Sequence, residues 1–307
     1  MMLPRIFSVL VGALTVLLAD HGGLASAAPG GVVQFHHIHG LAVDPKDPDV
    51  LFVATHGGLL RVMQDRQWEW VGEARHDYMG FTHHPQEQGT VFVSGHPQGG
   101  GLPNPMGLLV SRDGGRTWQP LALRGQVDFH AMTISADGET LYGWNVMGSP
   151  GLYRVSAKDG TWTRVDAAGL RDVFSLAAHP KEPESLLAAT RSGLLLSRDG
   201  GNTWRSATSH LEGVSVTAVA YTPKDPRRLY AYAARQDLGF LTSSDGGKTW
   251  RTTGLFLGSE DAIAVLAPSA HGEQTIYMAT FTSDLQKSTD GGVTWKALAR
   301  KGKPVAP

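Results

Sequence analysis

The sequence contains no cysteine among its 307 residues, which excludes disulfides, thiolate metal ligands and thiol nucleophiles. It also lacks an excess of charge, because 27 Lys and Arg residues against 28 Asp and Glu residues leave a formal net charge of −1. The chain therefore offers no basic surface for nucleic acid and no polybasic segment for anionic lipid, and we expect neither partner. Its chemistry must come from His, Met, Arg, Tyr or carboxylate side chains.

Long apolar runs are also missing, except for one near the N-terminus. An uncharged, mainly apolar run at residues 6–19 follows the basic Arg5, and Ala25-Ser26-Ala27 has the small-x-small pattern of a cleavage site. The run is shorter than the roughly 20 residues that span a bilayer. We therefore interpret residues 1–27 as a signal peptide and expect a secreted or periplasmic mature chain, residues 28–307, without a membrane span. An uncleaved N-terminal anchor is the alternative.

Glycine is abundant, with 38 residues, beside 17 prolines and only 18% charged residues. This composition is typical of short strands joined by tight turns, and we predict an all-β protein. An octapeptide of the form Ser-x-Asp-Gly-Gly-x-Thr-Trp occurs at residues 111–118, 197–204, 243–250 and 288–295. Degenerate copies end at Trp68 and Trp162, so that six tryptophans recur at intervals of 42 to 50 residues. Such intervals are typical of four-stranded propeller blades.

The octapeptide has the composition of a hairpin turn. Its Asp can accept backbone N–H bonds, its two glycines can adopt positive φ, and its Trp ring can pack beneath the turn. The repeat resembles the Asp box, or BNR repeat, of sialidases, xyloglucanases, the sortilin luminal domain and photosystem II assembly factors. The resemblance implies a β-propeller of a sialidase-like or glycosyl hydrolase-like exported bacterial family. It implies little about activity, because the Asp box occurs in proteins of unrelated function.

We predict a single six-bladed β-propeller with Asp-box hairpin turns and no second domain. The approximate blades are residues 36–75, 76–125, 126–168, 169–211, 212–256 and 257–300. In each blade an innermost strand is followed by a second strand, a third strand that leads into the box, and a fourth after the Trp. The sequence leaves two closures open: residues 296–299 complete the last blade alone, or residues 32–35 add an outer strand to it.

A shared proline after the first strand aligns the blades and shows which side chains meet. In an up-and-down blade, the start of the first strand and the end of the second lie on one face, the mouth, opposite the Asp boxes. Blade 3 lacks this proline and is placed by the pattern of its strand. Eight residues before the proline, or at the matching position, stand His37, Asp77, Asp128, Asp172, Ser215 and Glu260. Six residues before it, or at the matching position, stand His39, Met79, His130, Phe174, Thr217 and Ala262. The second strands end at His56, His96, Val146, Arg191, Arg235 and Phe281.

Histidines are concentrated in the first three blades, where nine of the 13 lie between His36 and His130. We predict a metal site at the mouth whose ligands are His37, His39, Met79 and His130. A set of His, Met and carboxylate groups without thiolate suits copper or zinc, and Met favours copper. The alternative is neutral imidazoles that hydrogen bond to neighbouring blades. In contrast, His83, His84 and His179 lie at the other end of the first strands, near the far face, and we expect them to be structural or solvent-exposed.

Further mouth residues are candidates for ligand binding, namely His56, His96, Arg191 and Arg235. The arginines can clamp a carboxylate, or they can pair with Asp172 or Glu260. The longest loop, residues 97–107, is rich in Gly and Pro and follows the second strand of blade 2. It is either a lid over the mouth or a flexible insertion.

Two classes of function are the main candidates, and a metal-dependent enzyme or an assembly factor similar to that of photosystem II stays open beside them. The first is an exported propeller that binds a metal ion, a small molecule or a protein partner at its His-rich mouth. The second is a glycoside hydrolase acting on glycans, with Asp77, Asp128 and Asp172 as candidate acid and nucleophile or base. A sialidase would also need three converging arginines and an Arg-Ile-Pro segment before the first box. The only Arg-Ile pair, Arg5-Ile6, lies in the predicted signal peptide.

Overall fold

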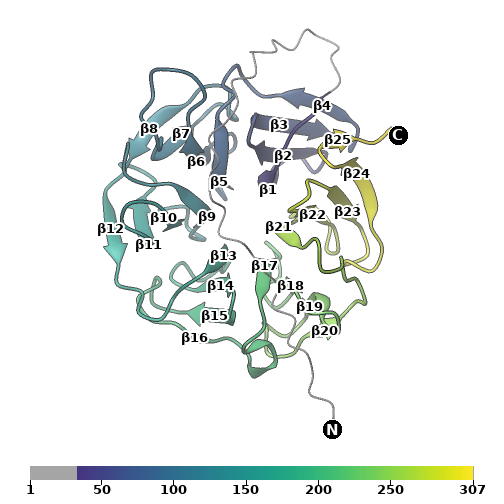
Figure 1. The fold of residues 1–307 in the computed structure, drawn as a ribbon. Coiled ribbons are helices and arrows are strands. Elements are labelled where there is room, and N and C mark those ends of the chain that lie inside the picture. The colour runs from purple at the N-terminus through teal and green to yellow at the C-terminus, as the bar shows by residue number, and fades with distance from the viewer. Residues whose placement is uncertain (1–32, 307) are drawn as a thin grey trace. The chain divides into compact units, whose positions relative to one another are not determined.

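The computed structural model describes residues 33–306, so the predicted signal peptide lies outside the described residues. The described chain forms six antiparallel sheets around a central axis, which confirms the predicted six-bladed β-propeller (Figure 1). A short 3-10 helix, Ser209–Leu211, is the sole helical element among the described residues. None of the helical structure between residues 33 and 306 is long and apolar enough to cross a membrane.

Each blade runs from an innermost strand at the axis to an outermost strand at the perimeter. Blades 1 to 3 consist of β1 (Ile38–Val43), β2 (Val50–Thr55), β3 (Gly58–Met63) and β4 (Gln67–Trp70); β5 (Asp77–His83), β6 (Val91–His96), β7 (Leu108–Ser111) and β8 (Gln119–Ala122); and β9 (Phe129–Ile134), β10 (Thr140–Asn145), β11 (Gly151–Ser156) and β12 (Trp162–Val165). Blades 4 to 6 consist of β13 (Val173–Ala178), β14 (Leu186–Thr190), β15 (Gly193–Ser197) and β16 (Arg205–Ser206); β17 (Val216–Tyr221), β18 (Leu229–Ala233), β19 (Gly239–Ser243) and β20 (Arg251–Thr252); and β21 (Ile263–Pro268), β22 (Ile276–Thr280), β23 (Leu285–Ser288), β24 (Lys296–Arg300) and β25 (Lys303–Pro304).

The ring closes between blades 6 and 1, where the innermost strands β21 and β1 lie side by side. Blade 6 is completed by its own C-terminal strands, since β24 pairs with β23 and β25 pairs with β24. Residues 33–37 form no strand; Phe35 N instead donates to the Gly302 carbonyl at 2.9 Å. His37 N donates to Ser283 Oγ at 2.9 Å, and Lys287 forms a 2.7 Å ion pair with Asp65. The structure thus selects the first of the two closures left open by the sequence.

The Asp boxes form the turns that their composition predicts. In the box at residues 197–204, Asp199 accepts a hydrogen bond from the Thr203 backbone N at 2.9 Å, and Gly200 and Gly201 have φ of 67° and 88°. Gly200 N donates to the Glu184 carbonyl in the turn between β13 and β14. Because that turn joins the first and second strands, the boxes and these turns share the face opposite the mouth, as predicted.

A β-bulge near the start of the innermost strand recurs in all six blades. The unpaired residues at the bulges are His39, Met79, His130, Phe174, Thr217 and Ala264. The predicted alignment of the first strands is correct for five blades, but wrong by two residues in blade 6. Its proline, Pro268, still pairs within β21, so Ala262 and Ala264 occupy the places assigned to Glu260 and Ala262. A bulge turns an extra side chain out of the ladder, in this case at the mouth.

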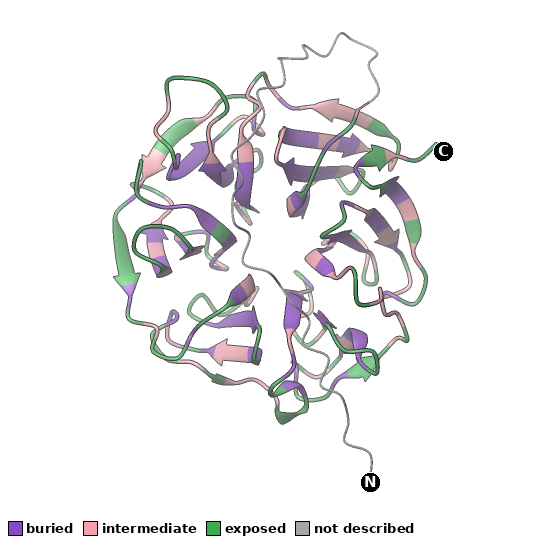
Figure 2. Cartoon of the chain, viewed as in Figure 1, coloured by how far each residue is buried: buried purple, intermediate pink, exposed green. Residues whose placement is uncertain are grey.

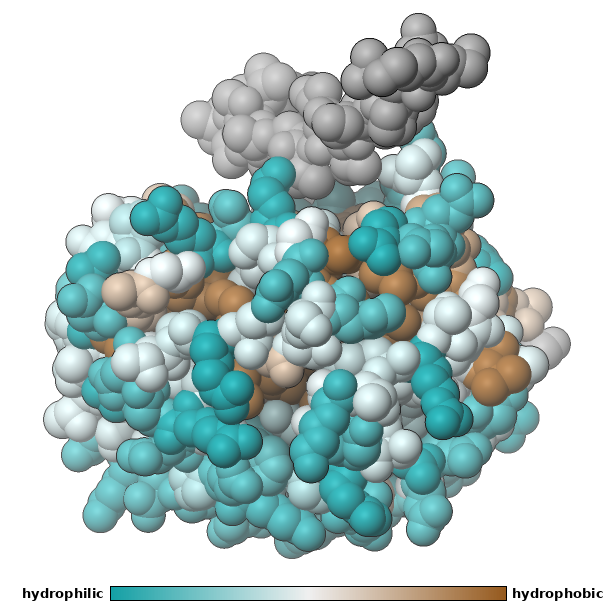
Figure 3. Space-filling view, turned by 90° about the horizontal axis from the view of Figure 1, so that it is seen from below, coloured by the Kyte–Doolittle hydropathy of each residue, from teal (hydrophilic) through white to brown (hydrophobic). Residues whose placement is uncertain are grey.

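Buried residues gather in the three inner strands of the blades, and exposed residues in the outermost strands and loops (Figure 2). Seen from the side, the outer wall carries mostly hydrophilic side chains with small hydrophobic areas between them (Figure 3). Glycine sets the distance between several blades. A Cβ on Gly40 would lie 2.4 Å from Phe81 Cβ of the next blade, and one on Gly80 would lie 2.4 Å from the Phe129 carbonyl oxygen. Blades 1 to 3 therefore approach one another closely directly beside the mouth.

The second glycine of an Asp box has a similar packing role, which a paired substitution tests. A Cβ on Gly292 would lie 2.2 Å from the buried Phe240 ring of blade 5, whereas the nearest atom to a Cβ on Gly291 is 3.8 Å away. Both glycines have positive φ. We expect Gly291→Ala to lower the free energy of unfolding by about 1 kcal/mol, from backbone strain alone. Gly292→Ala should cost about 1–3 kcal/mol more, from overpacking. Urea unfolding of both variants measures the difference, and equal losses would contradict this packing role.

Candidate functional site

Three imidazole rings from blade 1 stack at the mouth. His39 is the bulge residue of β1, His56 follows β2, and His37 precedes β1 with a φ of 46°. The ring centroids of His56 lie 4.6 Å from His37 and 4.7 Å from His39. We call these three residues the histidine stack.

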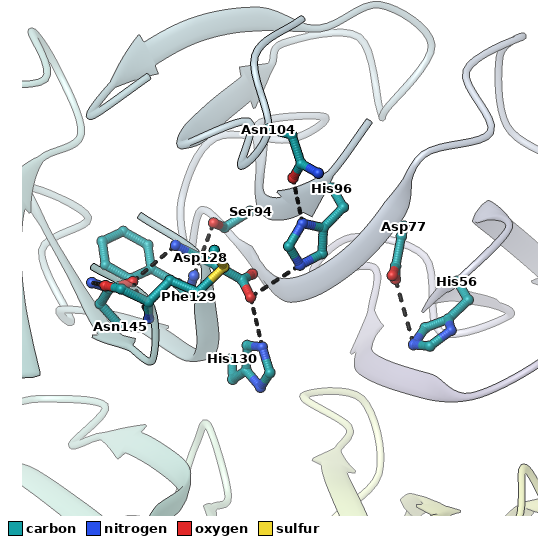
Figure 4. Close-up of polar contacts among 10 residues, drawn as sticks. His56, Asp77, Ser94, His96, Asn104, Asp128, Phe129, His130 and Asn145 are labelled. Carbon is teal, nitrogen blue, oxygen red and sulfur yellow. Dashed lines mark hydrogen bonds and ion pairs between the residues drawn. The ribbon is translucent and has the colours of Figure 1, made fainter. Parts of the chain in front are cut away.

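Asp77, the first residue of β5 in blade 2, faces His56 of the histidine stack (Figure 4). Its Oδ1 lies 3.5 Å from His56 Nε2. One ligand atom each from His39, His56 and Asp77 lie within 4.8 Å of one another, close enough to hold one metal ion. Among the described residues, His39 Nε2 and Asp77 Oδ1 are both buried and without a hydrogen-bond partner. Buried polar atoms of this kind are uncommon and call for an explanation such as an ion.

Burial determines the protonation of this group. It lowers the pKa of His39 to about 3 and that of His56 to about 4, with further lowering by the neighbouring imidazoles. Burial also raises the pKa of Asp77 to about 6, and the nearby Asp128 raises it further against the effect of His96. Both histidines are therefore neutral at pH 7, which is the form that coordinates metals.

A second cluster lies in blades 2 and 3 around Asp128, whose side chain is only 2% exposed. His130 Nε2 donates to Asp128 Oδ2 at 2.7 Å, and His96 Nε2 lies 3.2 Å from the same oxygen (Figure 4). Burial opposes ionisation of Asp128, but the hydrogen bonds from His130 and His96 outweigh it and hold its pKa well below the usual range. We call Asp128, His96 and His130 the Asp128 cluster.

His96 carries both ring protons in this arrangement. Its Nε2 faces the Asp128 carboxylate, and its Nδ1 lies 2.6 Å from Asn104 Oδ1, so both nitrogens meet acceptors. The Asp128 hydrogen bond raises the pKa of His96 to about 9, against the effect of burial. Asp128 and His96 therefore form an ion pair at neutral pH.

The loop at residues 97–107 is attached to both groups of side chains. Asn104 contacts His96, and Gln98 Nε2 donates to the His56 carbonyl at 3.0 Å. Gln98 N also donates to His76 Nδ1 at 3.1 Å. Sequence reasoning placed this loop over the mouth but identified none of Gln98, Asn104 and His76 as contacts. A polar residue in a Gly-rich loop carries no signal of its own until the loop's path is known.

The remaining predicted residues are spread around the mouth. Met79 is buried at the bulge of β5, and Asp172 is exposed at a φ of 49°. Arg191 lies 3.7 Å from Asp172, which is one of the two partners considered for it. Arg235 pairs with Asp237 at 2.7 Å and not with Glu260. The residue of blade 5 equivalent to Arg191 is Ala234, whose N donates to Ser215 O as Arg191 N donates to Asp172 O.

Two of the far-face histidines, His84 and His179, hold turns through their ring nitrogens. His84 Nδ1 accepts hydrogen bonds from the backbone N of Gln86 and Glu87, at 3.2 and 2.9 Å. His179 Nδ1 accepts equivalent bonds from Lys181 and Glu182. Both rings therefore close the turns that follow the innermost strands.

Comparison with known proteins agrees with the repeat and the fold. Residues 109–120 match the profile of the BNR/Asp-box repeat. The structure resembles a GH74 xyloglucanase from Xanthomonas campestris, at 17% identity and a TM-score of 0.59, over 88% of this chain and 46% of that chain. It also resembles YCF48 bound to D1 peptide, at 15% identity and a TM-score of 0.51, over 89% of this chain and 85% of that chain. The extracellular domain of BT4673 from B. thetaiotaomicron has 14% identity and a TM-score of 0.56, over 88% of this chain and 34% of that chain.

The repeat and the six sheets together define the class: the chain is a six-bladed β-propeller with Asp-box hairpin turns. It spans less than half the length of the xyloglucanase, and identities this low establish the fold alone. No curated protein matches the sequence. Function must therefore be argued from the mouth itself.

The ion pair of the Asp128 cluster predicts a pH dependence of stability. Because the pKa of His96 is raised to about 9 in the folded protein, the ion pair of His96 with Asp128 stabilises the fold fully below pH 6.5. This stabilisation is lost as the pH rises through about 9. The melting temperature of the wild type should therefore fall between pH 6.5 and 9.5. We expect this fall to be smaller in His96→Gln, which lacks the titrating imidazole. The exposed variant His210→Gln should keep the wild-type slope. Identical slopes for His96→Gln and the wild type would refute the pairing.

Proposed function

We propose that this protein is an exported propeller that binds a divalent transition metal ion, copper or zinc, at the mouth through His39, His56 and Asp77. The observation that carries the proposal is the convergence of one ligand atom from each residue within 4.8 Å, at a place where His39 Nε2 and Asp77 Oδ1 are buried without a hydrogen-bond partner. Two imidazoles and one carboxylate form a ligand set used by catalytic zinc sites, and imidazole also suits copper.

The surroundings of the three ligands support this assignment. The histidines are neutral, so metal binding displaces no proton from them at pH 7. Three protein ligands leave a coordination position for another group. The His37 ring lies against His56 and remains our predicted fourth ligand, with Met79 and His130 as further predicted ligands on the neighbouring blades. A Met79 contribution would favour copper over zinc.

Export is part of the proposal. Residues 1–27 have the pattern of a signal peptide, and residues 28–307 would then be the mature propeller. An oxidising compartment outside the cytoplasm is compatible with a chain that has no cysteine to oxidise.

Metal analysis of the protein purified after export, before and after soaking with copper or zinc and desalting, tests the proposal. We expect about one ion per chain in the wild type. The variants His39→Ala and Asp77→Asn should each weaken metal binding at least tenfold, because each removes one of the three proposed ligands. The matched control His210→Ala changes an exposed histidine of the 3-10 helix, which is not among the proposed ligands, and should retain the ion. Absence of a retained ion in the wild type, or full retention in both ligand variants, would refute the metal site.

Glycoside hydrolysis is the second candidate, favoured by a different observation. Asp77 and Asp128 begin adjacent blades at the mouth, and each has one buried carboxylate oxygen without a hydrogen-bond partner. Two such carboxylates are the minimum machinery of a glycosidase. Asp172, the third predicted residue, is exposed and lies beside Arg191, so we assign it no part in this pair.

A panel of chromogenic glycosides, assayed with the protein after chelator treatment, tests this candidate. A hydrolase should turn over at least one substrate without metal and lose at least a hundredfold in rate in both Asp77→Asn and Asp128→Asn. Asp172→Asn serves as the matched control and should keep its rate. No turnover by the wild type would exclude these glycosides as substrates and leave metal binding as the proposed function.

A further inference from the structure

A cavity of about 310 Å³ runs along the propeller axis beneath the mouth. All six innermost strands line it, and most of its walls are Ala, Val, Leu, Phe and Pro side chains. Hydroxyl and imidazole groups interrupt these walls at Thr82, His83, Thr133, Ser175 and Tyr221. The volume is near the lower limit for small-molecule sites, which combine apolar walls with a few placed polar groups.

The polar groups that matter lie at one end of the cavity. His39 and His130 both line it, at the start of their innermost strands, whereas Pro45, Pro85 and Pro223 line the opposite end. His39 is a proposed metal ligand, and His130 is held by Asp128 through its Nε2. One side chain of the histidine stack and one of the Asp128 cluster therefore line the same cavity.

Charge at this end favours an anion once the metal is bound. A divalent ion with Asp77 as its only carboxylate ligand keeps one positive charge, and Asp128 is already paired with two imidazoles. An anionic head group can then take the open coordination position of the metal. The apolar walls below it would receive an uncharged tail, since burial of apolar surface is favourable.

We propose that the axial cavity binds a small aliphatic carboxylate, with its head group on the metal ion beside His130 and its alkyl chain in the cavity. The inference rests on the proposed metal function and identifies the ligand class of the same site. It predicts a dependence on chain length, because each methylene that enters the apolar cavity should raise the affinity about fourfold. The dependence should end where the chain reaches the proline end.

Calorimetric titration of the zinc-loaded full protein with acetate, butanoate and hexanoate measures this dependence. We expect hexanoate to bind at least a hundredfold more tightly than acetate. Hexanol, which has the tail without the charge, should bind more weakly than hexanoate.

A variant that fills the cavity separates specific binding from adsorption. Ala264 lines the cavity at the bulge of β21, and the equivalent residue of blade 4 is Phe174, so the bulge accepts an aromatic side chain. Ala264→Phe should reduce hexanoate binding at least tenfold and leave zinc stoichiometry unchanged, since Ala264 offers no ligand. Ala234→Phe places the same ring on the exposed rim of blade 5 and should bind hexanoate like the wild type.

The outcomes distinguish this inference from the metal proposal. Zinc retention with equal affinity for acetate and hexanoate, or an Ala264→Phe variant that binds hexanoate normally, would overturn the cavity inference and leave the metal site intact. Absence of zinc binding would overturn the metal site, and with it the proposal that the carboxylate head group binds the metal ion. In that case the metal-free protein could still bind hexanoate. If Ala264→Phe abolished that binding, the cavity would still be supported as the site of the alkyl chain.

Discussion

The packing of each blade onto the next is the constraint on which the rest of this propeller depends. Six sheets can surround one axis only if their innermost strands approach closely, and glycines at the inner strands of blades 1 and 2 leave room for the neighbouring Phe81 side chain and Phe129 backbone. The Asp-box glycines have the same role at the far face, where Gly292 lies against Phe240. Closure of the ring then aligns the starts of all six innermost strands at a single mouth. Each chemical feature of the mouth follows from this convergence.

The recurring bulge converts the convergence into a site. In a regular strand, residues two apart lie on the same side of the sheet, and each residue pairs with one on the neighbouring strand. The bulge leaves one residue per blade unpaired, and it bends the strand there. In blades 4 to 6 that residue is Phe, Thr or Ala, whereas in blades 1 to 3 it is His, Met or His. The same bulge in all six blades thus places potential metal ligands at the mouth in blades 1 to 3, but not in blades 4 to 6.

Burial divides the mouth into two electrostatic environments. In the histidine stack, burial and the neighbouring imidazoles lower the pKa of His39 and His56, so both rings are neutral, and burial raises the pKa of Asp77 beside them. In the Asp128 cluster, a buried carboxylate meets two imidazoles directly, which lowers the pKa of Asp128 and raises that of His96, so both are charged at neutral pH. Identical residue types therefore have opposite protonation behaviour on adjacent blades, because one pairing is across a gap and the other is a direct hydrogen bond.

The sequence by itself determined the fold, since the octapeptide and its spacing specify hairpin turns and blades locally. It also indicated the His-rich half of the mouth, because the alignment of blades 1 to 5 needs only strand periodicity. It could not select the ligand group. His39, His56 and Asp77 come from two blades, and their distances depend on how closely those blades pack. The same reason explains the misplaced residues of blade 6, where Pro268 continues the strand that the other prolines end. Local patterns fix local geometry, whereas contacts between blades are decided only when the ring closes.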